Sequence, residues 1–417
     1  MIPAKLDTVV IGAGFAGLGV GAALKEKGVQ DFAILDRGDR PGFAWSRRYD
    51  RLHLHSAFHD MPADGGMRRE YPTFMPSAQM VEYLGRYATL HGLTSHLHTH
   101  ARVMRVERAS GGGWRIETTR GATHARYVAV ATAINRVPST PTVPEREAFA
   151  GEVLHSADYR NAERFRGASA LIVGSGNSAA EIALDLVEGG AGRVAMRVRG
   201  PRHFVPRAVM GAMFRFMRFI GQMSSEKQDA MHRVTYGTAE YEQMATTRDK
   251  LFVKLTSDLS RYGIRKPATG PATETALYGR IPTFDVGAMK YIRNRRIEVI
   301  DGNARLIRCF AEGGVELGDR VEHFDVVIFA TGFHPGLEEF IADKELLGAS
   351  RNFAANFPLT DNRCRSRIDP SMFFPGFDPT PIGGLSLGRW GWEVGERIAD
   401  ELNQPASSAA PEARRVF

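Results

Sequence analysis

Residues 8–28 read TVVIGAGFAGLGVGAALKEKG, and this stretch decides the fold. Its first four residues form a short apolar run that is typical of a buried parallel strand. Gly12, Gly14 and Gly17 follow with the spacing GxGxxG, which permits a tight turn, close approach of a ligand and close packing of helix on strand. The stretch therefore predicts a dinucleotide site, with the pyrophosphate at the N-terminus of a helix.

The next predicted strand ends in an acid. The sequence DFAILDR places Asp36 24 positions after Gly12, close to the spacing of about 20 expected for a residue that contacts ribose. A carboxylate there accepts hydrogen bonds from ribose hydroxyls and repels a 2′-phosphate. The first loop is therefore predicted to hold FAD or NAD, and the loop alone leaves that choice open.

A second stretch of the same design lies far downstream. ALIVGSGNSAAEIALDLVEGG has Gly174 and Gly176 at the first two glycine positions and Ala179 at the third, an accepted exchange. The strand after it, RVAMRVRGPR, contains Arg197 and Arg199 near its end in place of an acid. A guanidinium pairs with a 2′-phosphate through two hydrogen bonds, so this loop is predicted to prefer NADP(H); the alternative is a solvated strand end. The first loop is then left for FAD, and the pair implies a flavoprotein reduced by NADPH.

Length and composition indicate how many domains, which partners and which cellular location to expect. The chain has 417 residues, more than the roughly 250–300 at which a single core stops growing, so two domains are expected. The net charge of +7 suits anionic ligands, but the Lys and Arg residues are scattered, so no nucleic-acid partner is expected. Neither a signal-like leader nor an apolar run of about 18 residues is present, so we expect no transmembrane segment and a cytoplasmic location.

A motif between the two loops carries a family resemblance. FAGEVLHSADY fits FxGxxxHxxxY through Phe149, Gly151, His155 and Tyr159, and this is the identifying sequence of flavin-containing monooxygenases, which are class B flavoprotein monooxygenases. The order of FAD loop, motif and NADPH loop is also that of the family. YDRLHLHSAFHDMP, RYGIRKPATGPATETALYGRIPTFDVG and FDVVIFATGFHP resemble the YUCCA-type branch, the plant flavin monooxygenases of auxin synthesis. The resemblance spans nearly all of residues 5–403.

The expected fold is α/β, with two Rossmann-like dinucleotide-binding domains. The runs ATA and ATG mark strand ends that lead out of each domain, and three prolines beginning with Pro138 mark an extended crossover. We expect an FAD domain at 1–150 and 336–417, with an NADPH domain inserted at 151–335.

The resemblance also implies a reaction. Reduced flavin would react with oxygen to give a C4a-hydroperoxyflavin, which bound NADP⁺ shields and which delivers one oxygen atom to a small-molecule substrate. The substrate would be a nitrogen or sulfur nucleophile, or a 2-oxo acid that loses its carboxylate. The expected partners are this substrate and molecular oxygen, with a homodimer as the candidate assembly.

The residues assigned to cofactor binding gather in the two loops, at the following strand ends and in the crossover runs. They are Gly12, Gly14, Phe15, Ala16, Gly17, Asp36, Arg37, Trp45, Val103, Ala131, Thr132, Gly174, Ser175, Gly176, Asn177, Ser178, Arg197, Arg199, Thr331, Gly332 and Phe377. For Trp45 the alternative is plain core packing, and for Asn177 and Ser178 it is ordinary helix capping. No metal ligand is assigned.

Asn135 and His55 are the candidate catalytic residues. Asn135, in ATAINRVP, matches an asparagine of the family and is expected to hydrogen-bond the cofactors, unless it only forms a turn. His55 falls where plant members also carry histidine, and the sequence assigns it no chemical role. His155 is expected to hold the crossover in shape rather than act as a base.

Two departures from the family pattern concern the region where substrate is expected. Ala133 replaces the glycine of the family's ATGxNxxP, and the closing loop FDPTPIGGL differs from the more basic turn of plant members. In addition, residues 204–223 are rich in Met, Phe and Arg and predict an amphipathic helix, with a substrate-channel wall or a membrane-surface face as alternatives.

Three other enzyme classes fit parts of the pattern. A Baeyer–Villiger monooxygenase would have Trp followed by Pro or Asp at the end of the motif, whereas this chain has Tyr159 followed by Arg160. A disulfide reductase needs a redox dithiol, and Cys309 and Cys364 are far apart in the sequence. An FAD/NADPH oxidoreductase that does not transfer oxygen remains the other alternative.

Overall fold

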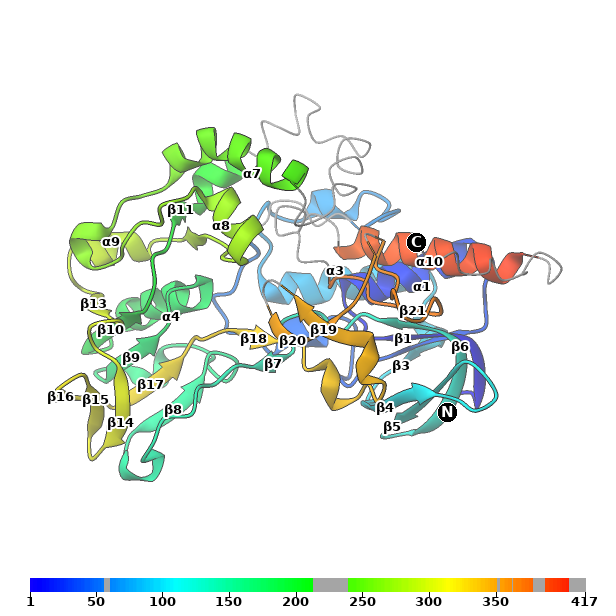
Figure 1. The fold of residues 1–417 in the computed structure, drawn as a ribbon, viewed down its shortest axis with the longest axis horizontal. Helices are drawn as coiled ribbons and strands as arrows, with labels where there is room; N and C mark the ends of the chain where they lie inside the picture. Colours follow the sequence, from blue (N-terminus) through cyan, green and yellow to red (C-terminus); the bar gives the residue numbers. More distant parts are fainter. Residues whose placement is uncertain (56–60, 213–238, 351–352, 362, 378–386, 405–417) are drawn as a thin grey trace.

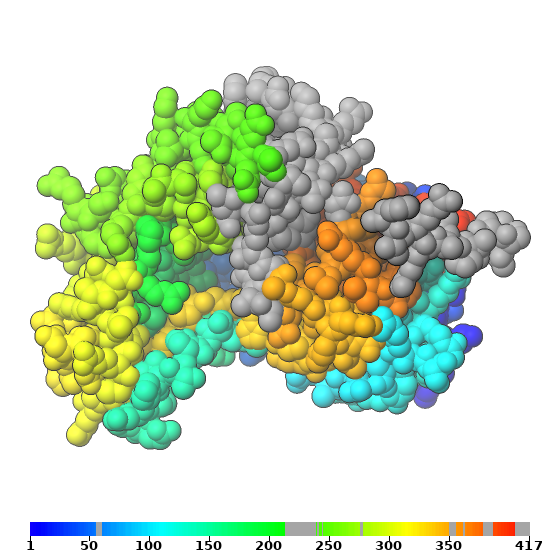
Figure 2. Space-filling model, viewed as in Figure 1, coloured from blue at the N-terminus to red at the C-terminus, as the bar shows by residue number. Residues whose placement is uncertain are grey.

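Two α/β units lie side by side and are joined near the middle of the molecule (Figure 1). The outline is indented between them in the space-filling view (Figure 2). The computed structural model describes residues 1–55, 61–212, 239–350, 353–361, 363–377 and 387–404.

The first unit is built on a sheet of order β3-β2-β1-β6-β5-β4, with β21 paired to β6. Its strands are β1 (Lys5–Ile11), β2 (Phe32–Leu35), β3 (Leu97–His98), β4 (Val103–Arg108), β5 (Trp114–Thr118), β6 (Gly121–Val130) and β21 (Met372–Phe373). The central strand β1 runs parallel to β2 and β6, and Ile11 is in register with Leu35 and Val130. The apolar run of β1 is buried on both faces, as a central parallel strand requires.

Helix α1 (Phe15–Glu26) follows β1 directly, and the closing helix α10 (Leu387–Asn403) packs against it. A Cβ added to Gly391 would lie 1.9 Å from the carbonyl oxygen of Ala16, and one added to Gly19 would lie 2.3 Å from that of Gly388. The two helices therefore touch backbone to backbone, which only glycine permits at these positions.

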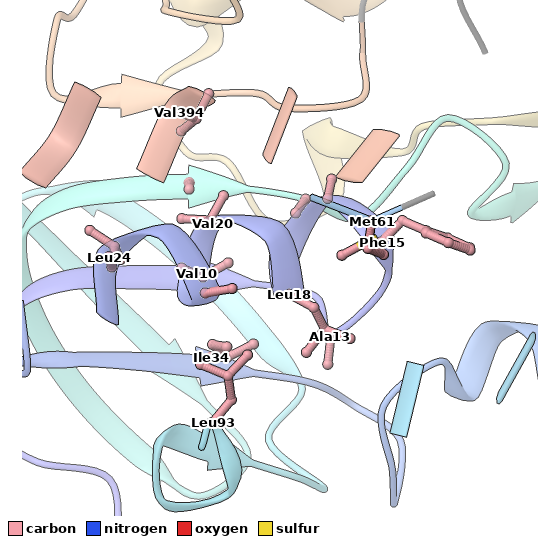
Figure 3. Close-up of a cluster of buried hydrophobic side chains, with 14 of the residues drawn as sticks. Val10, Ala13, Phe15, Leu18, Val20, Leu24, Ile34, Met61, Leu93 and Val394 are labelled. Carbon is pink, nitrogen blue, oxygen red and sulfur yellow. The ribbon is translucent and has the colours of Figure 1, made fainter. Parts of the chain in front are cut away.

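The core of the first unit forms around this helix pair. In Figure 3, Val20 of α1 faces Val394 of α10, while Val10 and Ile34 of the sheet lie on the opposite side of α1. All four side chains are buried. The C-terminal helix is thus part of the same core as the N-terminal strand.

The second unit is built on an all-parallel sheet of order β13-β10-β9-β17-β8. Its strands are β8 (Glu152–His155), β9 (Ser169–Val173), β10 (Arg193–Val198), β13 (Glu298–Asp301) and β17 (Val326–Phe329), and α4 (Asn177–Glu188) follows β9. Around them lie α7 (Ala239–Phe252), α8 (Pro271–Tyr278), α9 (Ala288–Arg293), β11 (Phe204–Pro206), β12 (Thr283–Asp285), β14 (Ile307–Ala311), β15 (Gly314–Leu317) and β16 (Arg320–His323).

The predicted α/β class with two dinucleotide-type units is therefore confirmed. Strands of the first sheet come from residues 5–130 and 372–373, and those of the second from residues 152–329. The boundaries 1–150 with 336–417, and 151–335, agree with this division and stay a prediction.

Two short strands join the units. β7 (Val137–Pro138) and β18 (Phe333–His334) belong to the two crossovers and pair antiparallel. The Arg136 Nε donates a hydrogen bond to the carbonyl of Pro335 at 2.7 Å. The chain therefore crosses between the units twice, and the two crossings are bonded to each other.

The prediction of one amphipathic helix from residue 204 is wrong at its start. Phe204 has no exposed surface and lies in β11, which pairs in parallel with β12, and the helical conformation begins at residue 207. Strand pairing buries this aromatic ring better than a surface helix would. The part of the stretch from residue 213 onward and the closing loop after Phe377 lie outside the described residues. In the described part of the chain, no helix combines the length and apolar character that crossing a membrane demands.

Ala133 adopts a left-handed backbone conformation. Its φ angle is +62°, and the corresponding residue of the other crossover, Gly332, has φ of +91°. A left-handed conformation costs an L-residue with a Cβ roughly 1–2 kcal/mol, whereas glycine adopts it freely. The replacement of glycine by alanine seen in the sequence therefore introduces backbone strain into the first crossover.

Ala133→Gly should raise the free energy of unfolding by about 1 kcal/mol, because it removes this strain. Denaturant titration followed by circular dichroism measures the change. Ala129→Gly is the control, since Ala129 is fully buried in β6 without a positive φ and should lose about 0.5–1 kcal/mol. Equal losses in both variants would contradict the presence of strain at Ala133.

Candidate active site

The three glycines of the first loop have two different structural roles. A Cβ on Gly12 would lie 2.6 Å from the carbonyl oxygen of Ala131, and one on Gly17 would lie 1.8 Å from that of Gly12. A Cβ on Gly14 meets no atom within 4 Å. Gly12 and Gly17 therefore allow the packing, while Gly14 faces open space at the start of α1.

The second glycine loop repeats this geometry. A Cβ on Gly174 would lie 2.4 Å from the carbonyl oxygen of Ala330, and one on Gly176 meets nothing within 4 Å. Ala179 takes the third place and is fully buried. Neither α1 nor α4 has a side-chain cap in the described structure, so the N–H groups at both helix starts are available to a phosphate.

The acid predicted to contact ribose lies against the first loop. One Asp36 oxygen accepts the N–H of Ala13 at 2.8 Å, and the other accepts the N–H of Gly38 at 2.7 Å. The carboxylate is half-buried beside the turn, where a ribose bound to this loop would lie. Arg37, the next residue, is exposed.

The placement of Arg197 argues against its predicted contact with a 2′-phosphate. The N–H of Gly174 bonds to the carbonyl of Arg197 as that of Gly12 bonds to Leu35, so Arg197 corresponds to Leu35 and Val198 corresponds to Asp36. The Arg197 side chain is buried, and its guanidinium donates to the carbonyls of Arg305 and Gly302 at 2.8 and 2.6 Å. Burial and the charge of Arg199 lower its pKa. The side chain is a structural link between strand and loop.

Two other arginines are better placed for a phosphate at the second loop. Arg199 is exposed and directly follows Val198. Arg202, which the sequence analysis missed, has its Nε 3.4 Å from the Ser175 hydroxyl oxygen and donates to the carbonyl of Ile281 at 2.9 Å. Burial lowers the pKa of Arg202, but a guanidinium stays charged at neutral pH. The only signal in the sequence was a third arginine in the segment RVRGPR.

The polar residues of the second loop also bind protein groups. The Asn177 Oδ1 accepts the N–H of Phe284 at 2.7 Å, and the carbonyl of Ser175 accepts the Thr283 hydroxyl at 2.7 Å. Strand β12 is thereby fastened to the loop. Ser178, at the start of α4, is near enough to the Tyr49 hydroxyl to lower its pKa, against the larger raising effect of burial. Asn177 and Ser178 are therefore anchors of neighbouring segments, whichever contacts they make to a phosphate.

Several predicted cofactor residues prove to be core side chains. Phe15 is 4% exposed and packs edge to face on Trp45, with 6.3 Å between the ring centroids. Ala16 is buried beneath α10. Phe377 has no exposed surface and packs on Phe374; this favours core packing, and its assignment to cofactor binding stays a prediction. Trp45 is half-buried.

The remaining predicted cofactor residues lie on the first sheet and in the two crossovers. Val103 is half-buried at the start of β4, and Thr331 bonds through its hydroxyl to the carbonyl of Ser139. Thr132 of the first crossover has a buried hydroxyl oxygen without a hydrogen-bond partner in the described structure. An unpaired buried hydroxyl is unfavourable, which is consistent with a ligand group at that point.

The crossovers carry Asn135 and His155. Asn135 is exposed, and its carbonyl accepts the Arg48 guanidinium at 3.2 Å, while Arg48 also lies 4.8 Å above the ring of Phe333. The Nε2 of His155 contacts the carbonyl of Gly332 at 3.0 Å, and its Nδ1 accepts the N–H of Ala157 at 3.1 Å. Burial lowers the pKa of His155. Its role in holding the crossover, as the sequence suggested, fits these contacts.

His55 lies between the two units. Its Nε2 is 2.9 Å from an oxygen of Glu181 on α4, and its ring stacks on Phe284 of β12 with centroids 5.6 Å apart. The side chain of His55 is 18% exposed and that of Glu181 only 1%. The sequence pattern does not single out Glu181, because a glutamate in an amphipathic helix is ordinarily solvated.

Comparison with known proteins agrees with this architecture. The family described as Pyridine nucleotide-disulphide oxidoreductase matches residues 9–209. Indole-3-pyruvate monooxygenase YUCCA1 of rice (Oryza sativa subsp. japonica) is 32% identical over 80% of this chain and 78% of its own length. The probable indole-3-pyruvate monooxygenase YUCCA8 of Arabidopsis thaliana is 29% identical over 98% of this chain and 93% of its own length.

A solved structure shows the same fold. The flavin-containing monooxygenase of Stenotrophomonas maltophilia is 21% identical, with a TM-score of 0.64 over 96% of this chain and 100% of the bacterial one. Neither Cys309 nor Cys364 forms a disulfide. On the evidence of its sequence relatives and its fold, the chain belongs to the flavin-containing monooxygenase family and resembles its YUCCA-type members.

Proposed function

We propose that this enzyme is an NADPH-dependent flavin monooxygenase that transfers one oxygen atom of O₂ to a small organic acid, with a 2-oxo acid as the preferred substrate class. The observation that carries the proposal is the pair of glycine loops, each with open space before its middle glycine and an uncapped helix behind it. The names of the plant relatives, which are indole-3-pyruvate monooxygenases, support the 2-oxo acid.

The residues present fit two dinucleotides. Gly14 leaves room for the pyrophosphate of FAD, and the Asp36 carboxylate beside the loop would accept hydrogen bonds from the ribose hydroxyls of that FAD. Gly176 leaves equivalent room for NADPH, and Arg199 and Arg202 supply positive charge beside the second loop. The bound flavin supplies the redox chemistry with oxygen. The chain supplies binding, orientation and exclusion of water.

The first test is rapid-mixing absorption spectroscopy. Enzyme reduced anaerobically with NADPH is mixed with oxygenated buffer, and we expect a transient spectrum that differs from both reduced and oxidised flavin. With ¹⁸O₂ and a panel of an aryl 2-oxo acid, a tertiary amine and a thioether, label should enter the acid product and carbon dioxide should be released. Immediate return of oxidised flavin with stoichiometric peroxide, for every substrate, would instead identify an oxidoreductase without oxygen transfer.

A matched pair of glycine substitutions tests the assignment of the two cofactors. Gly14→Val should yield a folded protein without flavin, because the new side chain fills the open space before α1. Gly176→Val fills the equivalent space before α4, and should yield a yellow protein that no longer binds NADP⁺. Flavin absorbance and calorimetric titration with NADP⁺ give the two readouts. The opposite pattern would exchange the two sites.

Arg199→Ala should raise KM for NADPH roughly ten- to a hundredfold, as expected for loss of a charge-assisted hydrogen bond, and leave KM for NADH within about twofold. Steady-state oxidation of both nucleotides measures this. Arg197→Met is the control, since that side chain binds only backbone carbonyls in the described structure and should lower stability without changing cofactor preference. A large loss of NADPH preference in Arg197→Met would restore Arg197 to the phosphate site.

A further inference from the structure

His55 belongs to the N-terminal part of the chain, but it contacts Glu181 and Phe284 of the second unit. Its ring lies between Glu181 of α4 and Phe284 of β12. Both neighbours come from the unit that carries the proposed NADPH site. The position of His55 is therefore set by the opposite unit.

The first contact is with a buried carboxylate. Glu181 lies four residues after Asn177, the first residue of α4, which is about one helical turn from the proposed phosphate position. The 2.9 Å separation of His55 Nε2 and Glu181 Oε1 is an ion-pair distance, although the two groups are not aligned as a hydrogen bond. Burial lowers the pKa of Arg207, and the charge of Glu181 partly offsets that lowering.

The second contact is through an aromatic ring. Phe284 and His55 are nearly parallel, with an interplanar angle of 19°. The N–H of Phe284 is bonded to Asn177, and the hydroxyl of its neighbour Thr283 is bonded to Ser175, both in the second glycine loop. A shift of this loop would therefore move β12 and the ring that stacks on His55.

The rest of the segment before His55 is fastened to the same helix. Tyr49 is 4% exposed and packs in the core of the second unit, and burial together with the charge of Glu181 raises its pKa well above the usual value. The guanidinium of Arg51 lies 3.7 Å from Asp185 and also pairs with Glu188. Residues 49–55 thus run along one acidic face of α4.

We propose that Glu181 is a positioning residue for His55, and that the side chains of Tyr49 and His55, which face α4, transmit occupancy of the NADPH site to the N-terminal unit. This rests on the proposed function, in which the second loop binds NADPH. Phosphate bound at the start of α4 would fix Ser178 and Glu181, and through them Tyr49 and His55. The position of the imidazole would then depend on whether the nucleotide is present.

Chemical labelling of His55 tests the proposal without relying on turnover. The FAD-loaded enzyme is treated with diethyl pyrocarbonate, and mass spectrometry with fragmentation follows carbethoxylation of His55. His53 is an internal control two residues away, since its Nδ1 contacts the carbonyl of Arg51 at 2.7 Å and, in the described part of the chain, it forms no hydrogen bond or ion pair with α4. In the wild-type enzyme, saturating NADP⁺ should slow labelling of His55 about fivefold and leave His53 unchanged.

Variants of the residues that contact His55 test which of them is responsible for its protection by NADP⁺. Glu181→Gln and Phe284→Leu should each speed labelling of His55 at least threefold without NADP⁺ and abolish most of the protection that NADP⁺ gives. Glu298→Gln, in the same unit but paired with Arg193 rather than with residues 49–55, should behave as the wild type. Unchanged labelling in both Glu181→Gln and Phe284→Leu, with circular dichroism showing a native fold, would overturn the proposal.

A double-mutant cycle separates positioning from a merely structural role. If Glu181 acts through His55, Glu181→Gln and His55→Asn should each lower kcat several-fold, leave KM for NADPH within twofold, and together cost no more than either alone. Additive losses would overturn the link. If NADP⁺ does not bind to the wild type at all, the proposed function fails, yet faster labelling of His55 in Glu181→Gln would still establish Glu181 as its positioning residue.

Discussion

The pairing of the two crossovers is the constraint on which the arrangement of both dinucleotide sites depends. Strands β7 and β18 run antiparallel between the sheets (Figure 1), and the Arg136 side chain binds the carbonyls of Pro335 and Gly336. Each crossover begins at the residues that pack against a glycine loop, Ala131 against Gly12 in the first unit. The β7–β18 pair therefore connects the residues that pack beneath one glycine loop directly to those that pack beneath the other.

Residues 49–55 form a second connection between the two units, and the forces that hold it differ from those of the β7–β18 pair. The β7–β18 pair is held by backbone hydrogen bonds, which fix one register. Residues 49–55, in contrast, contact α4 through side chains. Arg51 has part-exposed partners, so each pair contributes little in water. The two connections together suit a site in which a nucleotide is bound on one side and chemistry occurs on the other.

Much of the fold was predictable because it rests on local patterns. The two glycine loops, the strand before each and Asp36 all follow from spacing, and the structure places them as expected. The contacts of Arg197 disfavour its predicted role; spacing from a glycine identifies a strand end only to within a residue or two, and successive side chains of a strand point to opposite faces. The hydrogen bond from the N–H of Gly174 to the carbonyl of Arg197 matches that from Gly12 to Leu35. It fixes which residue of the second strand corresponds to Asp36, and only the folded structure supplies it.

Glu181 shows what a sequence conceals. A glutamate in a helix that also contains Asp185 and Glu188 has the pattern of a solvated face, and only tertiary packing reveals that its side chain is 1% exposed. Burying a carboxylate is costly unless a partner compensates it, and an apolar residue of similar size would stabilise the helix at least as well. The stability of α4 therefore does not explain the charge. The imidazole 2.9 Å away does, because an ionised or hydrogen-bonding partner is what fixes the orientation of a histidine ring.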